Sequence, residues 1–297
     1  MAFPAGRHRI AALGLAAFAA FACRTTPTPA VKAPVDRIAT LADTAFPAGP
    51  FGAAARRGRA LLAHTPDSLP QYAPSALRCT SCHLDEGARR NGLMLVGTFA
   101  RFPQYRARSG RVDLLADRIN DCFARSLNGR PLVRGGKDMT DIITYLAWLS
   151  RGVGVFDSLP GQGLAKLAPL AGDTARGSAL FASSCSRCHG AHGEGGKFTG
   201  PVPPLWGDRS FNIGAGMVRV RTLAAFLRAN MPFDQPGSLT DQQAFDLAAF
   251  VASRPRPDFA GKENDWPNGD PPPDVAYVTT AAKRSAAAAR STPTGAH

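Results

Sequence analysis

Two short stretches decide the fold: Cys79-Thr80-Ser81-Cys82-His83 and Cys185-Ser186-Arg187-Cys188-His189. Both follow the C-x-x-C-H pattern, in which two thiols form thioethers with the vinyl groups of haem and the adjacent histidine ligates the iron. A zinc site would bring two cysteine pairs into one small module, whereas these pairs lie 106 residues apart and each has its own histidine. The sequence therefore predicts two covalently bound haem c groups.

The elements around the two motifs indicate a duplicated, all-α architecture. Each motif follows a predicted helix, over 53–64 and 174–184, the second with Asp173 as its N-cap. Each is followed by a loop region and a closing helix, which spans 139–150 in the first half and starts after the capping box Thr240-Asp241-Gln242-Gln243 in the second. A helix, a haem-binding turn, a loop and a crossing helix form the layout of a class I cytochrome c domain, and we predict two in tandem.

Changes in composition along the chain set the expected boundaries. The 44% hydrophobic content of the 297 residues excludes a disordered chain, and two ordinary domains account for the length. The predicted segments are a signal peptide over 1–22, a Pro/Thr-rich tether over 23–44, a first cytochrome c domain over 45–152 with the active-site haem, a Gly/Pro-rich linker over 153–170, a second domain over 171–260 with the electron-transfer haem, and an extended low-complexity tail over 261–297.

The N-terminus reads as an export signal. Arg7 and Arg9 precede an apolar run over 10–22 that is too short to span a bilayer, and Ala20-Phe21-Ala22 forms a small-x-small cleavage site. Cleavage there makes Cys23 the mature N-terminus, which suits a lipoprotein. We expect a periplasmic protein with a lipid anchor on Cys23; the alternative is a soluble periplasmic protein with an incidental thiol.

The sixth ligand of each iron must come from elsewhere in the chain. In the second half the donors are Met217, in a Gly-rich loop, and Met231, which precedes a proline. A methionine thioether opposite histidine raises the redox potential and makes a good electron carrier. We favour Met217 with Met231 as the alternative, although methionines also serve as ordinary core packing.

In the first half the residue at a suitable distance is Cys122. The alternative interpretations are a buried thiol or half of a disulfide with Cys23. The flanking residues are polar and cationic, and neighbouring arginines favour the thiolate, which is both a nucleophile and a soft metal ligand. We therefore predict a distal-ligand or catalytic role for Cys122.

The segment 118–132, preceded by 102–110, resembles the active-site region of dihaem thiosulfate dehydrogenases, which couple two thiosulfates into tetrathionate. Pro204-Leu205-Trp206-Gly207 and the segments 210–217 and 254–257 of the second half are similar as well. The resemblance implies a first haem ligated by His83 and Cys122 and a second ligated by His189 and Met217. Gly190 stands where some relatives place lysine, which favours methionine. The resemblance also implies electron transfer to a soluble or membrane-bound cytochrome c.

Charge is concentrated around Cys122. The chain carries a net charge of +13, of which residues 85–137 contribute +6 and residues 138–260 only +1. An arginine-rich pocket would attract two thiosulfate dianions and hold them together despite their repulsion. The basic residues gather near a haem motif in an exported chain, so we expect no nucleic-acid partner. The candidate substrate-binding residues are Arg106, Arg108, Arg118, Arg125, Ser126 and Asn128.

Two other functions compete with thiosulfate oxidation, and the reverse reduction of tetrathionate would use the same site. One is a dihaem electron-transfer cytochrome that has no substrate of its own. The other is a sulfur-oxidation cytochrome that loads thiosulfate onto a carrier protein through a Cys-ligated haem. The first predicts that thiosulfate does not reduce the haems, and the second predicts that turnover needs a partner protein.

Overall fold

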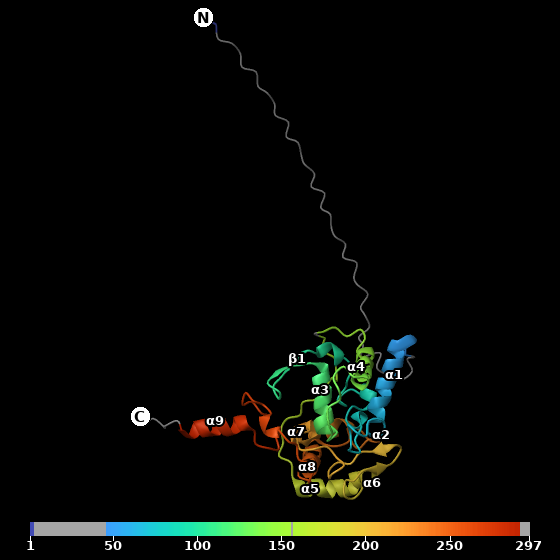
Figure 1. Cartoon of the computed structure of the whole chain (residues 1–297). Helices are drawn as coiled ribbons and strands as arrows, with labels where there is room; N and C mark the ends of the chain where they lie inside the picture. Colours follow the sequence, from blue (N-terminus) through green and yellow to red (C-terminus); the bar gives the residue numbers. More distant parts are fainter. Residues whose placement is uncertain (3–45, 156, 292–297) are drawn as a thin grey trace, which may run out of the picture. The chain divides into compact units, whose positions relative to one another are not determined.

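The computed structural model describes residues 1–2, 46–155 and 157–291 (Figure 1). All described helices and strands belong to one compact unit that begins after Lys32. The predicted cleavage site, Cys23 and nearly all of the predicted tether and signal peptide lie outside the described residues. Within the described ranges, none of the helices has both the length and the apolar character needed to cross a bilayer.

The first half of the chain is helical with one small hairpin. The strands of the hairpin are antiparallel, with Tyr105 opposite Val112. In chain order its elements are α1 Gly49–Ala63, α2 Thr65–Ser68, η2 Cys79–Ser81, η3 Asp85–Gly87, η4 Phe99–Arg101, β1 Gln104–Arg106, β2 Arg111–Asp113, α3 Leu115–Asp121, the π-helix η5 Cys122–Ser126, and α4 Lys137–Leu149.

The second half repeats this plan. Between α5 and α8 it again holds a haem motif, a short hairpin and a loop region. Its elements are α5 Thr174–Leu180, the π-helix η6 Phe181–Cys185, α6 Ser186–His189, β3 Gly196–Lys197, β4 Pro201–Val202, η7 Gly216–Val218, α7 Val220–Asn230, α8 Asp241–Ala252, and then η8 Lys262–Asn264 and α9 Thr280–Ser291.

The sequence placed the main helices correctly. The helix predicted over 139–150 is observed as α4, and the helix predicted over 53–64 starts earlier, at Gly49. Asp173 caps α5 by accepting a hydrogen bond from the Arg176 amide, and the Thr240 capping box starts α8 as predicted. The helix predicted over 174–184 ends at Leu180 and continues as the π-helix η6.

In each half, a glycine lies at the point where two helices cross. A Cβ on Gly58 of α1 would lie 2.0 Å from the Asp141 carbonyl oxygen of α4, and a Cβ on Gly177 of α5 would lie 2.1 Å from the Asp246 carbonyl oxygen of α8. These distances are far below van der Waals contact, so only glycine lets the two backbones approach this closely. Figure 1 shows α1 beside α4.

An ion pair accompanies each crossing at the same relative position. Arg57, which precedes Gly58, donates to Asp141 at 2.5 Å, and Arg176, which precedes Gly177, donates to Asp246 at 2.7 Å. Both carboxylates are nearly fully buried, with side chains 4% and 3% exposed. The two halves therefore share both the close glycine contact and the ion pair beside it, which join α1 to α4 in the first half and α5 to α8 in the second.

The C-terminal residues are folded rather than extended. The prediction of an extended tail over 261–297 is wrong for residues 261–291, because Asp265 and Trp266 are only 5% and 4% exposed and α9 follows them. The Trp266 amide donates to the Arg108 carbonyl at 2.9 Å, which brings this segment onto the β1–β2 hairpin. We call residues 261–279 the C-terminal strap. The Pro-rich composition of the strap gives no indication that Asp265 and Trp266 are buried.

Candidate active site

The first haem motif lies in a tight turn that fixes its histidine. His83 Nδ1 lies 2.5 Å from the Leu93 carbonyl oxygen and donates to it, which leaves Nε2 free for a metal. Burial lowers the pKa of His83 to about 4, so the imidazole is neutral, the form that ligates iron. Thr65 Oγ1 accepts from the Cys79 amide at 3.2 Å and holds the start of the motif against α2.

The second motif repeats this arrangement. His189 Nδ1 donates to the Pro203 carbonyl at 3.0 Å, and burial lowers its pKa as well. Cys185 ends the π-helix η6, and the remaining motif residues form α6. Each histidine therefore presents the same ring nitrogen, as two equivalent metal sites require.

Among the described residues, buried arginine donors without partners are available to haem, one of them next to the first motif, at Arg78. Three arginines have buried guanidinium nitrogens without a hydrogen-bond partner within the described part of the chain: Arg78 Nε, Arg219 Nε, and both Nε and Nη1 of Arg256. Burial lowers the pKa of Arg256 to about 10. Such orphaned donors suit haem propionates, and all five described cysteines are free thiols. The residues present therefore match two covalent haems in both attachment and charge.

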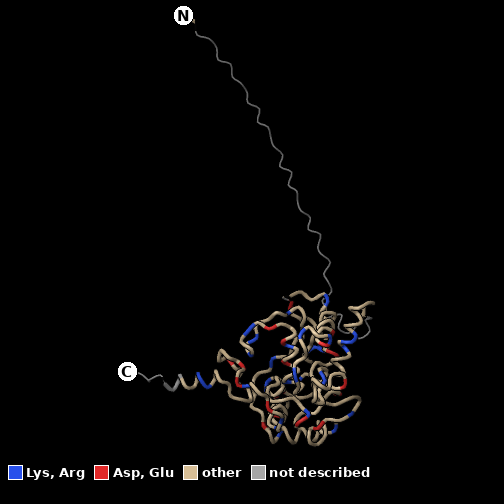
Figure 2. Tube along the Cα trace, viewed as in Figure 1, with Lys and Arg blue, Asp and Glu red and all other residues tan. Residues whose placement is uncertain are grey.

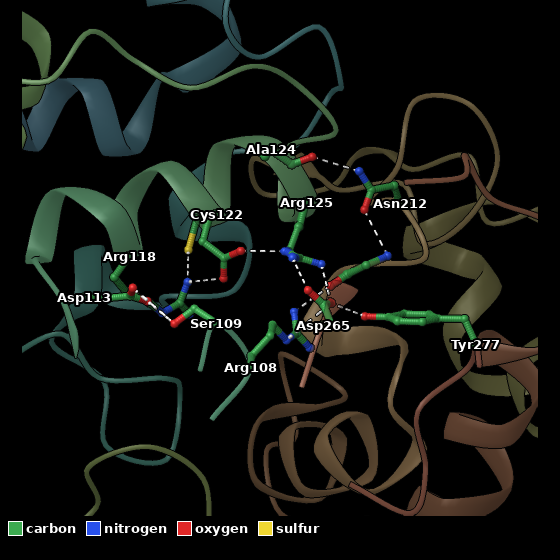
Figure 3. A network of polar contacts seen from close by, with 12 residues as sticks. Arg108, Ser109, Asp113, Arg118, Cys122, Ala124, Arg125, Asn212, Asp265 and Tyr277 are labelled. Atoms are coloured by element: carbon green, nitrogen blue, oxygen red, sulfur yellow. Dashed lines mark hydrogen bonds and ion pairs between the residues drawn. The ribbon is translucent and has the colours of Figure 1, made fainter. Parts of the chain in front are cut away.

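Cys122 begins the π-helix η5 and faces an arginine of the preceding turn. Arg118 Nη1 donates to Cys122 Sγ at 2.8 Å (Figure 3). Attraction to this sulfur is the largest influence on Arg118 and raises its pKa. Burial raises the pKa of Cys79 to about 11 and of Cys82 to about 12, and the nearby Cys122 sulfur adds to both shifts. The structure thus brings Cys122 to the first haem motif.

A chain of alternating charges leads away from Cys122. Asp121 lies 3.7 Å from Arg118 and accepts from Arg125 Nε at 2.5 Å. Burial alone would raise the pKa of Asp121, but Arg125, Arg118 and Arg108 outweigh it and lower the pKa. Arg125 also donates through both Nη atoms to Asp265, at 2.8 and 2.7 Å. All three donor nitrogens of Arg125 therefore already have carboxylate partners.

Two strap residues complete this network. Tyr277 Oη donates to Asp265 at 2.5 Å, and Arg108 Nε lies 4.0 Å from the same carboxylate (Figure 3). Asp265 and Tyr277 were not predicted from the sequence, because they lie well over a hundred residues beyond the arginines in a segment whose composition indicates a tail. Neither belongs to a motif, so the sequence contained no local signal for them.

Of the predicted substrate-binding arginines, Arg106 is the least neutralised. It lies on β1, has no carboxylate partner among the described residues, and has its pKa lowered by burial and by Arg118. Arg108 instead donates to the Gly214 carbonyl at 2.7 Å and lies over the Trp266 ring. Both line a cavity of about 390 Å³, which Asp265 also lines. Cys122 and Arg118 are not among the residues that line it.

The two predicted neutral donors differ in their surroundings. Ser126 ends η5 and is half-buried. Asn128 has a positive φ of 47° just after η5, and its Oδ1 accepts from Asn212 of the second half at 3.1 Å. Asn128 therefore already serves a contact between the two halves of the chain.

Comparison with known proteins places these features in a family. Residues 71–155 match the model of the SoxA/TsdA cytochrome c domain, and residues 172–251 match that of cytochrome c oxidase, cbb3-type, subunit III. A thiosulfate dehydrogenase of Psychrobacter arcticus is 44% identical over 78% of this chain and 72% of its own length. One of Allochromatium vinosum is 39% identical over 89% of this chain and 97% of its own length.

The chain belongs to the thiosulfate dehydrogenase family. The solved structure of thiosulfate dehydrogenase (TsdBA) from Marichromatium purpuratum matches 84% of it with a TM-score of 0.69 and 35% identity, and the match spans about half of that chain, 52%. Like its relatives, the chain is an oxidoreductase. The two tandem cytochrome c domains and the two covalent haem c groups predicted from the sequence are confirmed.

Within this thiosulfate dehydrogenase fold the two methionines differ in burial. The cysteines and histidines of both haem motifs, together with Cys122, are all partly exposed, as expected for side chains that border haem. Met217 is only 8% exposed and packs in the core as part of η7, whereas Met231 follows α7 and is partly exposed. The burial pattern therefore favours Met231, the alternative of the sequence analysis, over Met217.

Several of the arginines near Cys122 are paired with aspartates. Figure 2 shows acidic residues interspersed with the basic ones along the chain. Of the arginines near Cys122, Arg111 and Arg134 pair with Asp113 and Asp117. Arg125 is neutralised by two aspartates. The net charge of +6 already includes Asp113, Asp117 and Asp121, so of these carboxylates only Asp265 of the strap lowers the local positive charge further, by one.

Proposed function

We propose that this thiosulfate dehydrogenase family member oxidises two thiosulfates to tetrathionate at Cys122. The observation that carries the proposal is the 2.8 Å contact between Arg118 and the Cys122 sulfur beside the first haem motif. Thiolates are strong nucleophiles for sulfur, and an adjacent guanidinium attracts an anionic substrate to them. The four curated relatives at 35–44% identity are all named thiosulfate dehydrogenase.

The reaction balances through a covalent adduct on Cys122. The thiolate bonds to the sulfane sulfur of one thiosulfate, and this step releases two electrons and leaves a Cys–S–S–SO₃⁻ group. A second thiosulfate attacks the sulfane sulfur of that group, breaks its bond to Cys122 and leaves as tetrathionate, which restores the thiolate. Two bound haem c groups supply the one-electron acceptors for the oxidation. Run backwards, the same steps reduce tetrathionate.

In this proposal, residues around Cys122 bind the two thiosulfate dianions and offset their mutual repulsion. Arg118 is placed at the sulfur, and Arg106, which lacks a carboxylate partner in the described residues, has donors free for sulfonate oxygens. Arg125 is held by Asp121 and Asp265, so we assign it to positioning rather than to direct substrate contact. Replacing Arg106 by Gln should raise KM for thiosulfate about tenfold with a smaller effect on kcat.

We propose that His83 and Cys122 ligate the first iron and that His189 and Met231 ligate the second. A thiolate lowers and a thioether raises the reduction potential, so an external cytochrome c should take electrons from the second haem. Met231→Leu should abolish the far-red sulfur-to-iron absorption band of the oxidised protein. Met217→Leu serves as the matched control and should keep the band; the opposite result would assign the ligand to Met217.

One experiment tests the function directly. Oxidised holoenzyme is mixed with thiosulfate alone, and haem reduction and tetrathionate are recorded together. We expect both, and we expect Cys122→Gly to form no tetrathionate. Absence of reduction in the native protein would indicate an electron-transfer cytochrome. Turnover only with an added carrier protein would indicate a sulfur-loading cytochrome.

We further propose that the chain is exported to the periplasm and anchored by lipid on Cys23, on the strength of the sequence pattern over 1–23. Labelled palmitate should be incorporated into the native chain and not into Cys23→Ser. Export with no label in either chain would indicate a soluble periplasmic protein.

A further inference from the structure

A buried asparagine of the second cytochrome c domain contacts the helix that carries Cys122. Asn212 is 2% exposed and lies in the loop that leads to η7. Its Nδ2 donates to the Ala124 carbonyl at 2.8 Å and to Asn128 Oδ1 at 3.1 Å (Figure 3). Its backbone amide donates to the Arg125 carbonyl at 3.2 Å. Three hydrogen bonds thus join one residue of the second half to the end of η5.

The π-helical geometry of η5 creates the need for this contact. The Leu127 amide donates five residues back, to the Cys122 carbonyl. The next two amides, of Asn128 and Gly129, donate to the carbonyls of Arg125 and Phe123. Neither of them donates to the Ala124 carbonyl. A carbonyl left over at a helix end needs a partner when it is shielded from water. Asn212 supplies that partner from another domain.

Only an amide side chain satisfies all the groups around position 212. The Gly214 amide donates to Asn212 Oδ1 at 3.1 Å, which fixes this atom as the oxygen and the other as the nitrogen. Aspartate would place a carboxylate oxygen against two acceptors, and a shorter side chain would reach neither of them. The environment therefore requires one acceptor and two donors at this position.

We infer that Asn212 is a positioning residue for Cys122, through which the second domain fixes the orientation of the reactive sulfur. Cys122 starts the helix whose end Asn212 holds, so rotation of η5 about its axis would move the sulfur relative to Arg118 and the first haem motif. Displacements of about 1 Å at a reacting group cost up to about a hundredfold in rate. The inference rests on the proposed role of Cys122.

The chain provides a matched control in Asn230. This residue is 1% exposed, and its Nδ2 donates to the Asn91 carbonyl of the first half at 2.8 Å and to the Phe226 carbonyl at 3.0 Å. It therefore resembles Asn212 in burial, in donor use and in joining the two halves. It contacts no residue of η5 in these hydrogen bonds. A purely structural role would make the two residues equivalent.

The test compares Asn212→Asp, Asn212→Ala and Asn230→Asp as holoenzymes. Each is measured by urea unfolding, by the electron paramagnetic resonance signature of the thiolate-ligated first haem, and by kcat and KM for thiosulfate. We expect all three to unfold at lower urea. Only the two Asn212 variants should lose part of the thiolate signature, and their kcat should be lower than the native value by about tenfold or more. Asn230→Asp is compared by its thiolate signature and urea midpoint and not by kcat, because Asn230 precedes the proposed ligand Met231. If Asn212→Asp does not fold, the comparison uses Asn212→Ala, which adds no charge.

Two results would overturn the inference: an unchanged thiolate signature in both Asn212 variants, or the same loss of signature in Asn230→Asp. Failure of the proposed function is a separate outcome. If the native protein forms no tetrathionate, kcat carries no information, but the thiolate signature still shows whether Asn212 positions Cys122.

Discussion

Replacing the crossing glycine of the second domain by alanine tests the duplicated architecture directly. A Cβ on Gly177 would lie 2.1 Å from the Asp246 carbonyl oxygen and 2.8 Å from Phe250 Cβ, whereas ordinary contact begins at 3.4 Å. The helices α5 and α8 must therefore move apart by more than 1 Å. Both close atoms belong to the backbone or its first side-chain carbon, so no flexible group can yield.

The expected magnitude follows from two opposing effects. Alanine is the better helix former and would stabilise α5 by about 1 kcal/mol. Overpacking of a tight contact costs about 1–3 kcal/mol, and separation also lengthens the ion pair between Arg176 and Asp246. Because the clash is with backbone, the cost lies at or above the upper end of that range. We expect a net loss of about 2 kcal/mol in the free energy of unfolding.

The assay is urea unfolding of the holoenzyme, followed by far-ultraviolet circular dichroism and by haem absorbance. With a slope of about 2 kcal/mol per molar urea, the midpoint should fall by about 1 M. Ser178→Ala, at the next and exposed position of α5, is the control and should stay within about 0.5 kcal/mol. A Gly177→Ala midpoint equal to or above that of the native protein would show that the crossing is not tight, and the same comparison at Gly58 would extend the conclusion to the first domain.

Two further outcomes concern charge. Asp265→Asn removes a carboxylate partner from the buried Arg125, which is 9% exposed, and should lower the free energy of unfolding by up to about 3 kcal/mol, because part of the pairing is retained with Asp121. The control, Asp270→Asn at an exposed position, should change it by less than about 0.5 kcal/mol. Equal urea midpoints for the two variants would contradict the network. The hydrogen bond from Arg176 lowers the pKa of Asp246 to about 2, so the stabilisation of about 1–2 kcal/mol that this pair provides is present above about pH 4 and is lost as the pH falls toward 2. Asp246→Asn should therefore unfold more readily near neutral pH, and its free energy of unfolding should fall less between pH 4 and 2. An equal fall in the native protein and the variant would refute this.

The sequence predicted the features that depend on local pattern. The C-x-x-C-H motifs specify covalent haem because their chemistry needs adjacent residues, and the N-cap at Asp173 and the box at Thr240 act over three positions. Cys122 was singled out as well, because a thiol among arginines is unusual in composition, and the structure places it near the first haem motif; its role stays a prediction. These signals lie within a few residues of the features that they specify.

The remaining features depend on contacts that composition does not encode. Arg125 was expected to meet substrate, but Asp265, 140 residues away, occupies its donors. The hydrogen bonds of the π-helices at Cys122 and Phe181 span one residue more than those of an α-helix, and apolar periodicity over five residues cannot resolve this difference. The Gly-rich loop before Met217 indicated from the sequence that this methionine could approach a haem, whereas its 8% exposure depends on contacts that the local sequence does not show.

The strap also sets the order in which the site is completed. A polypeptide emerges from the ribosome N-terminus first, so Cys122 and Arg118 are made long before Asp265 and Tyr277. Until the last part of the chain has been synthesised, Arg125 lacks its bidentate carboxylate and the β1–β2 hairpin lacks its covering tryptophan. A chain that stops after the second cytochrome domain would carry every haem-attachment residue and still lack Asp265 and Tyr277, which hold the charge network beside Cys122.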